Sequence, residues 1–237
     1  MENLWMIARP LCLFALLFPV FLGACTYSGE DDPVSRRFSW FSYLDGVDLR
    51  QYCVPGAADR YRFVYNAVYI EQVRTYEMTA KAGPDGHLLK VRVIGSTDLR
   101  RLDVKEAADL MAPWRGREEK VWLRDVDLGK LKAAMAVGGV FEGAPKGMEL
   151  ASEDFYWIVA ACAGGRFSFN AYKWPSERFD NARFAGLLLA WDPTGVKVNE
   201  PRKVDFLLLY GEYFPDKPFG FNLRVGDNGL WGVDPLF

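Results

Sequence analysis

Residues 154–174 constrain the fold of this chain more than any other segment. They read DFYWIVAAC, then AGG, then RFSFNAYKW, so two runs rich in aromatic residues flank a glycine pair. Aromatic and β-branched residues are enriched in strands, and glycine supplies the backbone conformations that a tight turn needs. The segment therefore predicts a β-hairpin and, with it, an antiparallel sheet.

Other parts of the chain carry similar strand signals. Residues 60–80 are rich in Tyr and Val, and their spacing fits either strands or one helical stripe. We favour strands, because the turn GPDG at 83–86 and an alternating apolar pattern over 87–95 follow directly. Residues 219–233 form a further predicted hairpin around GDNG, and the apolar run at 204–213 predicts a buried central strand.

Three segments predict helices between these strands. Residues 103–113 start at capping-box spacing, 127–139 start with Asp127 as N-cap and end at two glycines, and 176–191 are rich in helix formers. A short strand is expected at 120–126. Because strands and helices do not alternate regularly, we expect an α+β fold. It would have a mainly antiparallel sheet built from hairpins, with about three interspersed helices.

Composition excludes several classes of function. The chain has 29 basic and 31 acidic residues, a net charge of −2, so it lacks the basic excess that a nucleic-acid partner requires. Its single histidine, His87, has no Gly-x-Ser-x-Gly segment to act with. The sequence also lacks the close His and Cys spacing of zinc sites and the glycine loops that bind phosphates. We therefore expect no cofactor and no metal.

The N-terminal residues have the features of an export signal. Arg9 precedes an uncharged run over 10–24, whose length fits the apolar core of a signal peptide and falls short of a membrane-spanning helix. The run leads into LGAC at 22–25, which closely resembles the lipobox, the signal-peptide motif of bacterial lipoproteins. An uncleaved anchor helix with an incidental Cys is the alternative.

The resemblance to lipoproteins implies an address. In this family the signal peptide, here residues 1–24, is removed, and the new N-terminal Cys25 carries acyl chains that anchor the protein in a membrane. Thr26, rather than Asp, follows the Cys, which implies the outer membrane. Residues 25–37 are polar and contain Gly and Pro, so they predict a flexible tether. Residues 38–237 would then form a single periplasmic domain.

The same resemblance accounts for the four cysteines. Cys12 would be removed with the signal peptide and Cys25 would be acylated, which leaves Cys53 and Cys162 in an oxidising compartment. Disulfides form and persist in such compartments, and these two thiols have no other partner there. We therefore expect a disulfide between Cys53 and Cys162.

A six-residue repeat supplies the candidate binding site. RFVYNA and RFSFNA share Arg, Phe, an aromatic residue, Asn and Ala without a gap, and each follows a Cys. Because side chains alternate between the faces of a strand, Arg62 and Asn66 share one face, and Arg166 and Asn170 likewise. A disulfide that draws the strands together would place all four in one polar patch, suited to carboxylates, sugars or peptide backbone. Chance similarity between two sheet strands is the alternative.

These features predict an outer-membrane lipoprotein on the periplasmic face. Its domain would bind a partner protein, peptidoglycan or another envelope component without catalysis. The alternative is a cell-envelope hydrolase that uses either Cys53 or Cys162 as nucleophile with His87, or a carboxylate pair such as Glu153 and Asp154. A free thiol would favour the hydrolase, and a disulfide would exclude its thiol version.

Overall fold

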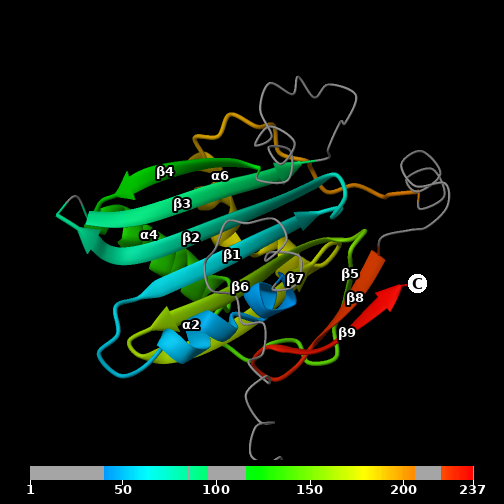
Figure 1. The fold of residues 1–237 in the computed structure, drawn as a ribbon, viewed down its shortest axis with the longest axis horizontal. Helices are drawn as coiled ribbons and strands as arrows, with labels where there is room; N and C mark the ends of the chain where they lie inside the picture. Colours follow the sequence, from blue (N-terminus) through cyan, green and yellow to red (C-terminus); the bar gives the residue numbers. More distant parts are fainter. Residues whose placement is uncertain (1–39, 85, 96–115, 206–219, 237) are drawn as a thin grey trace, which may run out of the picture.

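The computed structural model describes residues 40–84, 86–95, 116–205 and 220–236 (Figure 1). Some predicted features lie outside these residues: the signal peptide, Cys25, the tether, the helix at 103–113 and most of the strand at 204–213. The described part consists of two antiparallel sheets with helices against them.

Six strands form the main sheet, and every neighbouring pair in it is antiparallel. Their order is β4-β3-β2-β1-β6-β7 (Figure 1). The strands are β1 (Arg60–Ala67), β2 (Gln72–Gly83), β3 (Gly86–Gly95), β4 (Arg117–Leu123), β6 (Phe155–Ala163) and β7 (Arg166–Lys173). The hairpins predicted around 83–86 and over 154–174 are confirmed, and residues 60–80 form strands rather than a helix.

A second, three-stranded sheet contains the C-terminal hairpin. Its order is β5-β8-β9, and its strands are β5 (Glu149–Ala151), β8 (Gly220–Val225) and β9 (Leu230–Leu236). Strands β8 and β9 pair antiparallel, as the sequence around GDNG predicted. The sequence did not predict β5, because its three residues are too few to show an alternating pattern.

The described residues contain five helices, more than the three expected for the whole chain. They are a segment at 40–45, α2 (Val47–Tyr52), α4 (Asp125–Val137), α5 (Glu177–Asp180) and α6 (Arg183–Ala190). The helix predicted over 176–191 is in fact two helices. They are separated because the backbone of Ala182, at φ −72° and ψ 67°, leaves the helical region.

Helix α4 starts before the residue that was expected to cap it. It begins at Asp125, and Arg124 occupies the N-cap. Asp127 lies within the first turn instead, and its Oδ2 accepts a 3.3 Å hydrogen bond from the Arg124 backbone N–H. The carboxylate therefore still satisfies a backbone donor at this helix end. The preceding strand ends at Leu123, three residues earlier than predicted.

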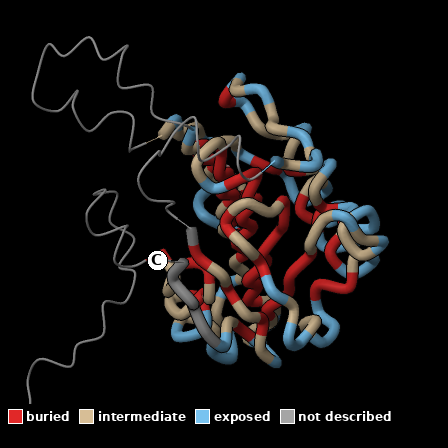
Figure 2. Tube along the Cα trace, turned by 90° about the vertical axis from the view of Figure 1, so that its right-hand side faces the viewer, coloured by how far each residue is buried: buried red, intermediate tan, exposed pale blue. Residues whose placement is uncertain are grey.

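Apolar clusters cover both faces of the main sheet. On one face, which we call the α4 face, helices α4 and α6 pack, and Phe184 meets Trp157 edge to face. On the opposite face, the α2 face, Leu44 and Leu223 pack with Val64, so helix 40–45 and the small sheet lie there. Figure 2 shows buried positions along the interior strands and exposed positions mainly at loops. The main sheet is thus the middle layer.

Candidate functional site

Cys53 and Cys162 form the predicted disulfide. Cys53, which follows α2, is bonded to Cys162 of β6 with an S–S distance of 2.04 Å. Neither sulfur is therefore a free thiol. His87 lies on β3, and β1 and β2 separate it from β6, so it is roughly 14 Å from Cys162 at the usual strand spacing. These positions therefore do not provide the free thiol and adjacent base that the thiol version of the hydrolase requires.

The repeated Arg and Asn side chains do not form one patch. In the sheet register Arg62 lies opposite Ala160, which lies opposite Phe169 on β7. The second copy of the motif is therefore shifted by three residues, since its arginine is Arg166. An odd shift moves side chains to the opposite face. Arg62 accordingly lies on the α2 face, whereas Asn170 lies on the α4 face.

The buried side chain of Arg62 connects the sheet to the helices on the α2 face. It is 3% exposed, and its Nη1 and Nη2 donate to the two carboxylate oxygens of Asp48 at 2.8 and 2.6 Å. Its Nε donates to Glu77 at 3.1 Å, and Nη1 also donates to the Tyr43 carbonyl at 3.0 Å. Such bidentate pairing fixes geometry, so these contacts position helix α2 rather than a ligand.

The Glu77 carboxylate lies between two cations on this face. Its side chain pairs with Arg62 at 3.1 Å and with Lys90 at 3.0 Å. Burial by itself raises the pKa of Glu77, but the charges of Arg62 and Lys90 outweigh it, so the pKa is lowered. Glu77 therefore contributes to stability in its ionised form.

Asn66 closes the turn between β5 and β6. It is 2% exposed, and its Nδ2 donates to the carbonyls of Ser152 and Asp154 at 3.0 and 2.6 Å. The carboxylate of Asp154 accepts from the Ala151 N–H at 2.8 Å and pairs with Lys173 at 2.7 Å. One member of the predicted Glu153–Asp154 pair is thus bound into this turn, where it stabilises the backbone.

His87 joins the β2–β3 hairpin to helix α4. It is 2% exposed, its Nδ1 accepts a 3.0 Å hydrogen bond from the Lys81 N–H, and its Nε2 lies 2.8 Å from Oδ1 of Asp125. Because Nδ1 is the acceptor, Nε2 carries the proton and donates to the carboxylate. The histidine therefore has a structural role at this end of the sheet.

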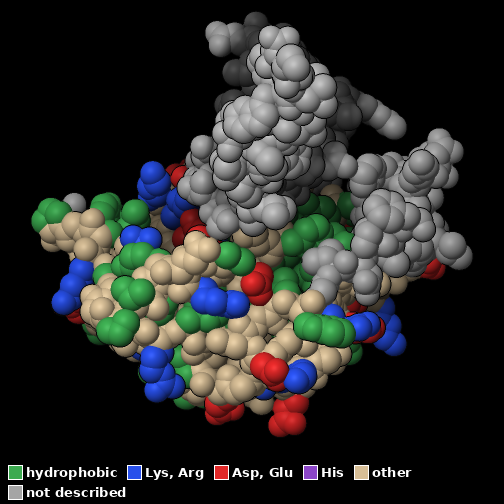
Figure 3. All heavy atoms as spheres, turned by 60° about the horizontal axis from the view of Figure 1, so that its bottom comes forward, with side chains coloured by type: hydrophobic (Ala, Val, Ile, Leu, Met, Phe, Trp, Pro, Cys, Tyr) green, Lys and Arg blue, Asp and Glu red, His purple; other side chains and the backbone are tan. Residues whose placement is uncertain are grey.

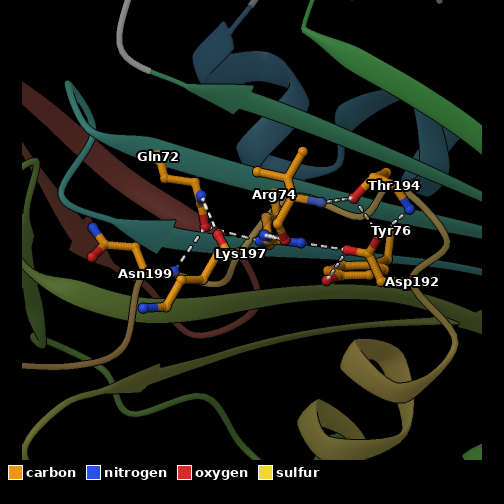
Figure 4. A network of polar contacts seen from close by, with 8 residues as sticks. Gln72, Arg74, Tyr76, Asp192, Thr194, Lys197 and Asn199 are labelled. Carbon is orange, nitrogen blue, oxygen red and sulfur yellow. Dashed lines mark hydrogen bonds and ion pairs between the residues drawn. The ribbon is translucent and has the colours of Figure 1, made fainter.

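A buried network that the sequence did not predict links β2 to the segment after α6. Figure 4 shows Gln72, Arg74 and Tyr76 of β2 facing Asp192, Thr194 and Asn199. Arg74 is fully buried and donates to Asp192 Oδ2 and to the Val196 carbonyl, both at 2.5 Å. Tyr76 also donates to Asp192, at 3.1 Å. The only sequence signal was the turn-forming DPTG at 192–195.

Asn170, the remaining buried member of the repeat, lies beneath a hollow at the end of α4. The hollow has a volume of about 280 Å³ and is lined by residues 137–139, Glu142, Glu177, Arg178 and Asn181. Asn170 is fully buried, and its Nδ2 donates to the carbonyls of Gly139 and Glu142 at 2.9 and 3.3 Å. Its Oδ1 accepts from the Ala171 N–H at 2.9 Å and from Arg178 Nη2 at 2.5 Å.

Arg178 presents a fixed guanidinium to this hollow. Besides Asn170, it donates through Nε to the Ala171 carbonyl at 3.1 Å, and it lies 4.9 Å above the ring of Tyr172. Within the described residues it forms no ion pair, and its Nη1 has no hydrogen-bond partner. The pKa of Tyr172 is raised, mainly because the side chain is buried. The charge of Arg178 lowers this pKa and the charge of Glu142 raises it, so both charges lie near the Tyr172 hydroxyl.

Surface charge is mixed on the face of the molecule drawn in Figure 3. Basic and acidic side chains are interspersed there among the described residues, without a large area of one sign. This agrees with the near balance of 29 basic and 31 acidic residues.

The described residues contain no metal centre, and no similar protein indicates a further site. Across residues 40–84, 86–95, 116–205 and 220–236, no group of three His, Cys, Asp or Glu side chains is placed to hold a metal ion. In the same residues no helix has the length and apolarity to cross a membrane. No family model, no curated protein and no solved structure matches this chain. The hollow beside Arg178 is therefore the candidate site, on its geometry alone.

Proposed function

We propose that this protein is a lipoprotein of the outer membrane whose periplasmic domain binds a partner protein or another component of the cell envelope, without catalysis. The observation that carries the proposal is the disulfide between Cys53 and Cys162. Disulfides persist in oxidising compartments, and this one occurs in a chain whose N-terminal residues resemble a lipoprotein signal. The two features are independent, and both favour export.

The binding role is supported by what the candidate side chains do. The buried candidates Arg62, Asn66 and His87 are engaged in contacts within the fold. Arg178, in contrast, lines a hollow, and its Nη1 has no hydrogen-bond partner within the described residues. A fixed cation beside a hollow suits recognition of a ligand, whereas the nucleophile and base of a hydrolase must lie within hydrogen-bond reach of each other.

Acylation of Cys25 tests the anchor. The full chain is produced in a bacterium with labelled palmitate, and the mature N-terminus is identified by mass spectrometry. We expect label on a protein that begins at Cys25, and we expect Cys25→Ser to remove it. The matched control is Cys12→Ser, which changes another cysteine of the same segment and should leave acylation intact. A protein that keeps residues 1–24 and takes no label would overturn the anchor.

Photo-crosslinking in living cells tests the binding role. A photoreactive residue replaces Val137, which is 74% exposed at the rim of the hollow, and a control replaces Val54, which is 54% exposed near the disulfide. We expect a discrete envelope protein or peptidoglycan adduct from Val137 and none from Val54. Release of new fragments from purified peptidoglycan would contradict the absence of catalysis.

A further inference from the structure

Within the described residues Arg178 is a cation that forms no ion pair. Two of its nitrogens are held in place, Nε by the Ala171 carbonyl and Nη2 by Asn170. Asn170 is itself fixed by two further carbonyl contacts and is fully buried. The guanidinium is thus pre-positioned, and the donors on Nη1 remain for a ligand. A planar guanidinium binds a carboxylate with good geometry.

The other charges of the hollow exclude a simple anion. Glu142 and Glu177 also line it, so its three charged side chains sum to −1. The C-terminal end of α4 adds partial negative charge, and its last turn contains no basic residue. A phosphate or sulfate would meet repulsion from both carboxylates. A ligand that brings one carboxylate for Arg178 and ammonium groups for Glu142 and Glu177 matches all three.

Size and apolar surface narrow the ligand further. The volume of about 280 Å³ lies near the lower end of the range for small-molecule sites, so the ligand is small. Val137 is 74% exposed on the lining and offers apolar surface for an aliphatic stem. We propose that the hollow binds a free diamino carboxylate of the lysine type. This deepens the proposed function and rests on it for the binding role of the domain.

Calorimetric titration of the full chain in detergent tests the chemistry of the ligand. The probe is L-lysine, compared with norleucine, which lacks the side-chain ammonium, and cadaverine, which lacks the carboxylate. We expect lysine to bind about tenfold or more tightly than either analogue, because each analogue loses a charge-assisted contact. No binding of lysine at about 10 mM, or equal binding of lysine and cadaverine, overturns the proposal.

Two variants test the residues. Arg178→Gln should weaken lysine binding about tenfold or more, whereas Arg183→Gln, which changes an exposed arginine outside the hollow, should not. Glu177→Gln is a second variant that should not disturb folding, because the exposed side chain of Glu177 makes no hydrogen bond within the described residues. It should weaken lysine binding severalfold with an unchanged Tm, while Asp180→Asn leaves binding intact. Unchanged affinity in both hollow variants would contradict the site.

A last comparison tests whether both carboxylates take part in binding. In Nα-acetyl-lysine the α-amino group is blocked, as it is in a lysine at the end of a peptide, so either Glu142 or Glu177 loses its ammonium partner. We expect weaker binding than for lysine, and equal affinity would contradict the pairing of both carboxylates. Lysine binding by a protein whose Cys25 is not acylated would support this site and overturn the membrane anchor. A protein whose Cys25 is acylated but which does not bind lysine would support the membrane anchor and overturn this site.

Discussion

Nη1 of Arg74 lies 2.5 Å from Oδ2 of Asp192, and the two side chains are 1% and 5% exposed. Strand β2 and the segment after α6 are thereby joined by a charge pair inside the protein. Thr194 donates to the other carboxylate oxygen through its N–H and its hydroxyl, at 2.9 and 2.6 Å. Burial of two charges is tolerated only when their hydrogen bonds are satisfied, and here they are.

Arg74→Met should therefore destabilise the protein strongly. It leaves the Asp192 carboxylate buried without its cation, which costs about 3–5 kcal/mol. Urea unfolding measures the loss. The control is Lys146→Met, since Lys146 and its partner Asp227 are 69% and 80% exposed and such pairs contribute at most about 1 kcal/mol. Similar losses in the two variants would show that the Arg74 pair does not hold this segment.

Reduction of the disulfide should lower the free energy of unfolding. Cys53 and Cys162 are 109 residues apart, and a crosslink of that span restricts the unfolded chain by about 4–5 kcal/mol on the chain-entropy model. Unfolding with and without reductant measures the difference, and a Cys53→Ala, Cys162→Ala double variant should match the reduced protein. A change below about 1 kcal/mol would contradict the expected stabilisation by this disulfide.

Most of the fold was predictable because strand and turn signals are local. The glycine pair at 164–165 and the GPDG turn lie between alternating or apolar runs, and both hairpins occur as expected. The spacing of apolar residues over 60–80 fitted both strands and a helix, and the turn that follows this segment correctly favoured strands. The break at Ala182 was missed because the apolar helix formers of 183–190 outweigh the signal of Asp180 and Asn181, which are weak helix formers at the end of α5.

The candidate site was predictable only in part, because the register between strands depends on long-range pairing and not on the local sequence. Two asparagines inside predicted strands were an unusual feature, and both do bind carbonyl groups of distant turns. The shift of three residues between β1 and β7 is set by how each strand pairs with β6. That pairing places Asn66 and Asn170 on opposite faces. The role of Arg178 depends on the same long-range geometry.

Glu77→Gln should make the free energy of unfolding depend less on pH in the acidic range. The lowered pKa of Glu77 means that its stabilisation is complete above the ordinary value of 4.5 and is lost as pH falls through the lower value of the folded state. The variant should be less stable than the unmodified protein at pH 7. The two free energies of unfolding should converge at low pH, where Glu77 is protonated. A constant difference across the pH range would contradict this assignment.

Gly46→Ala tests how closely the helices on the α2 face approach the sheet. Gly46 joins helix 40–45 to α2 at φ 69°, and an added Cβ would lie 2.7 Å from the Cβ of Ala160. We expect about 1–2 kcal/mol of backbone strain and about 1–3 kcal/mol more from the clash, because Ala160 cannot rotate away. Gly56→Ala is the matched control, since Gly56 has φ 88° with nothing within 4 Å. Thermal and urea unfolding should show a clearly larger loss for Gly46→Ala, and equal losses would mean that helix α2 can shift away from β6.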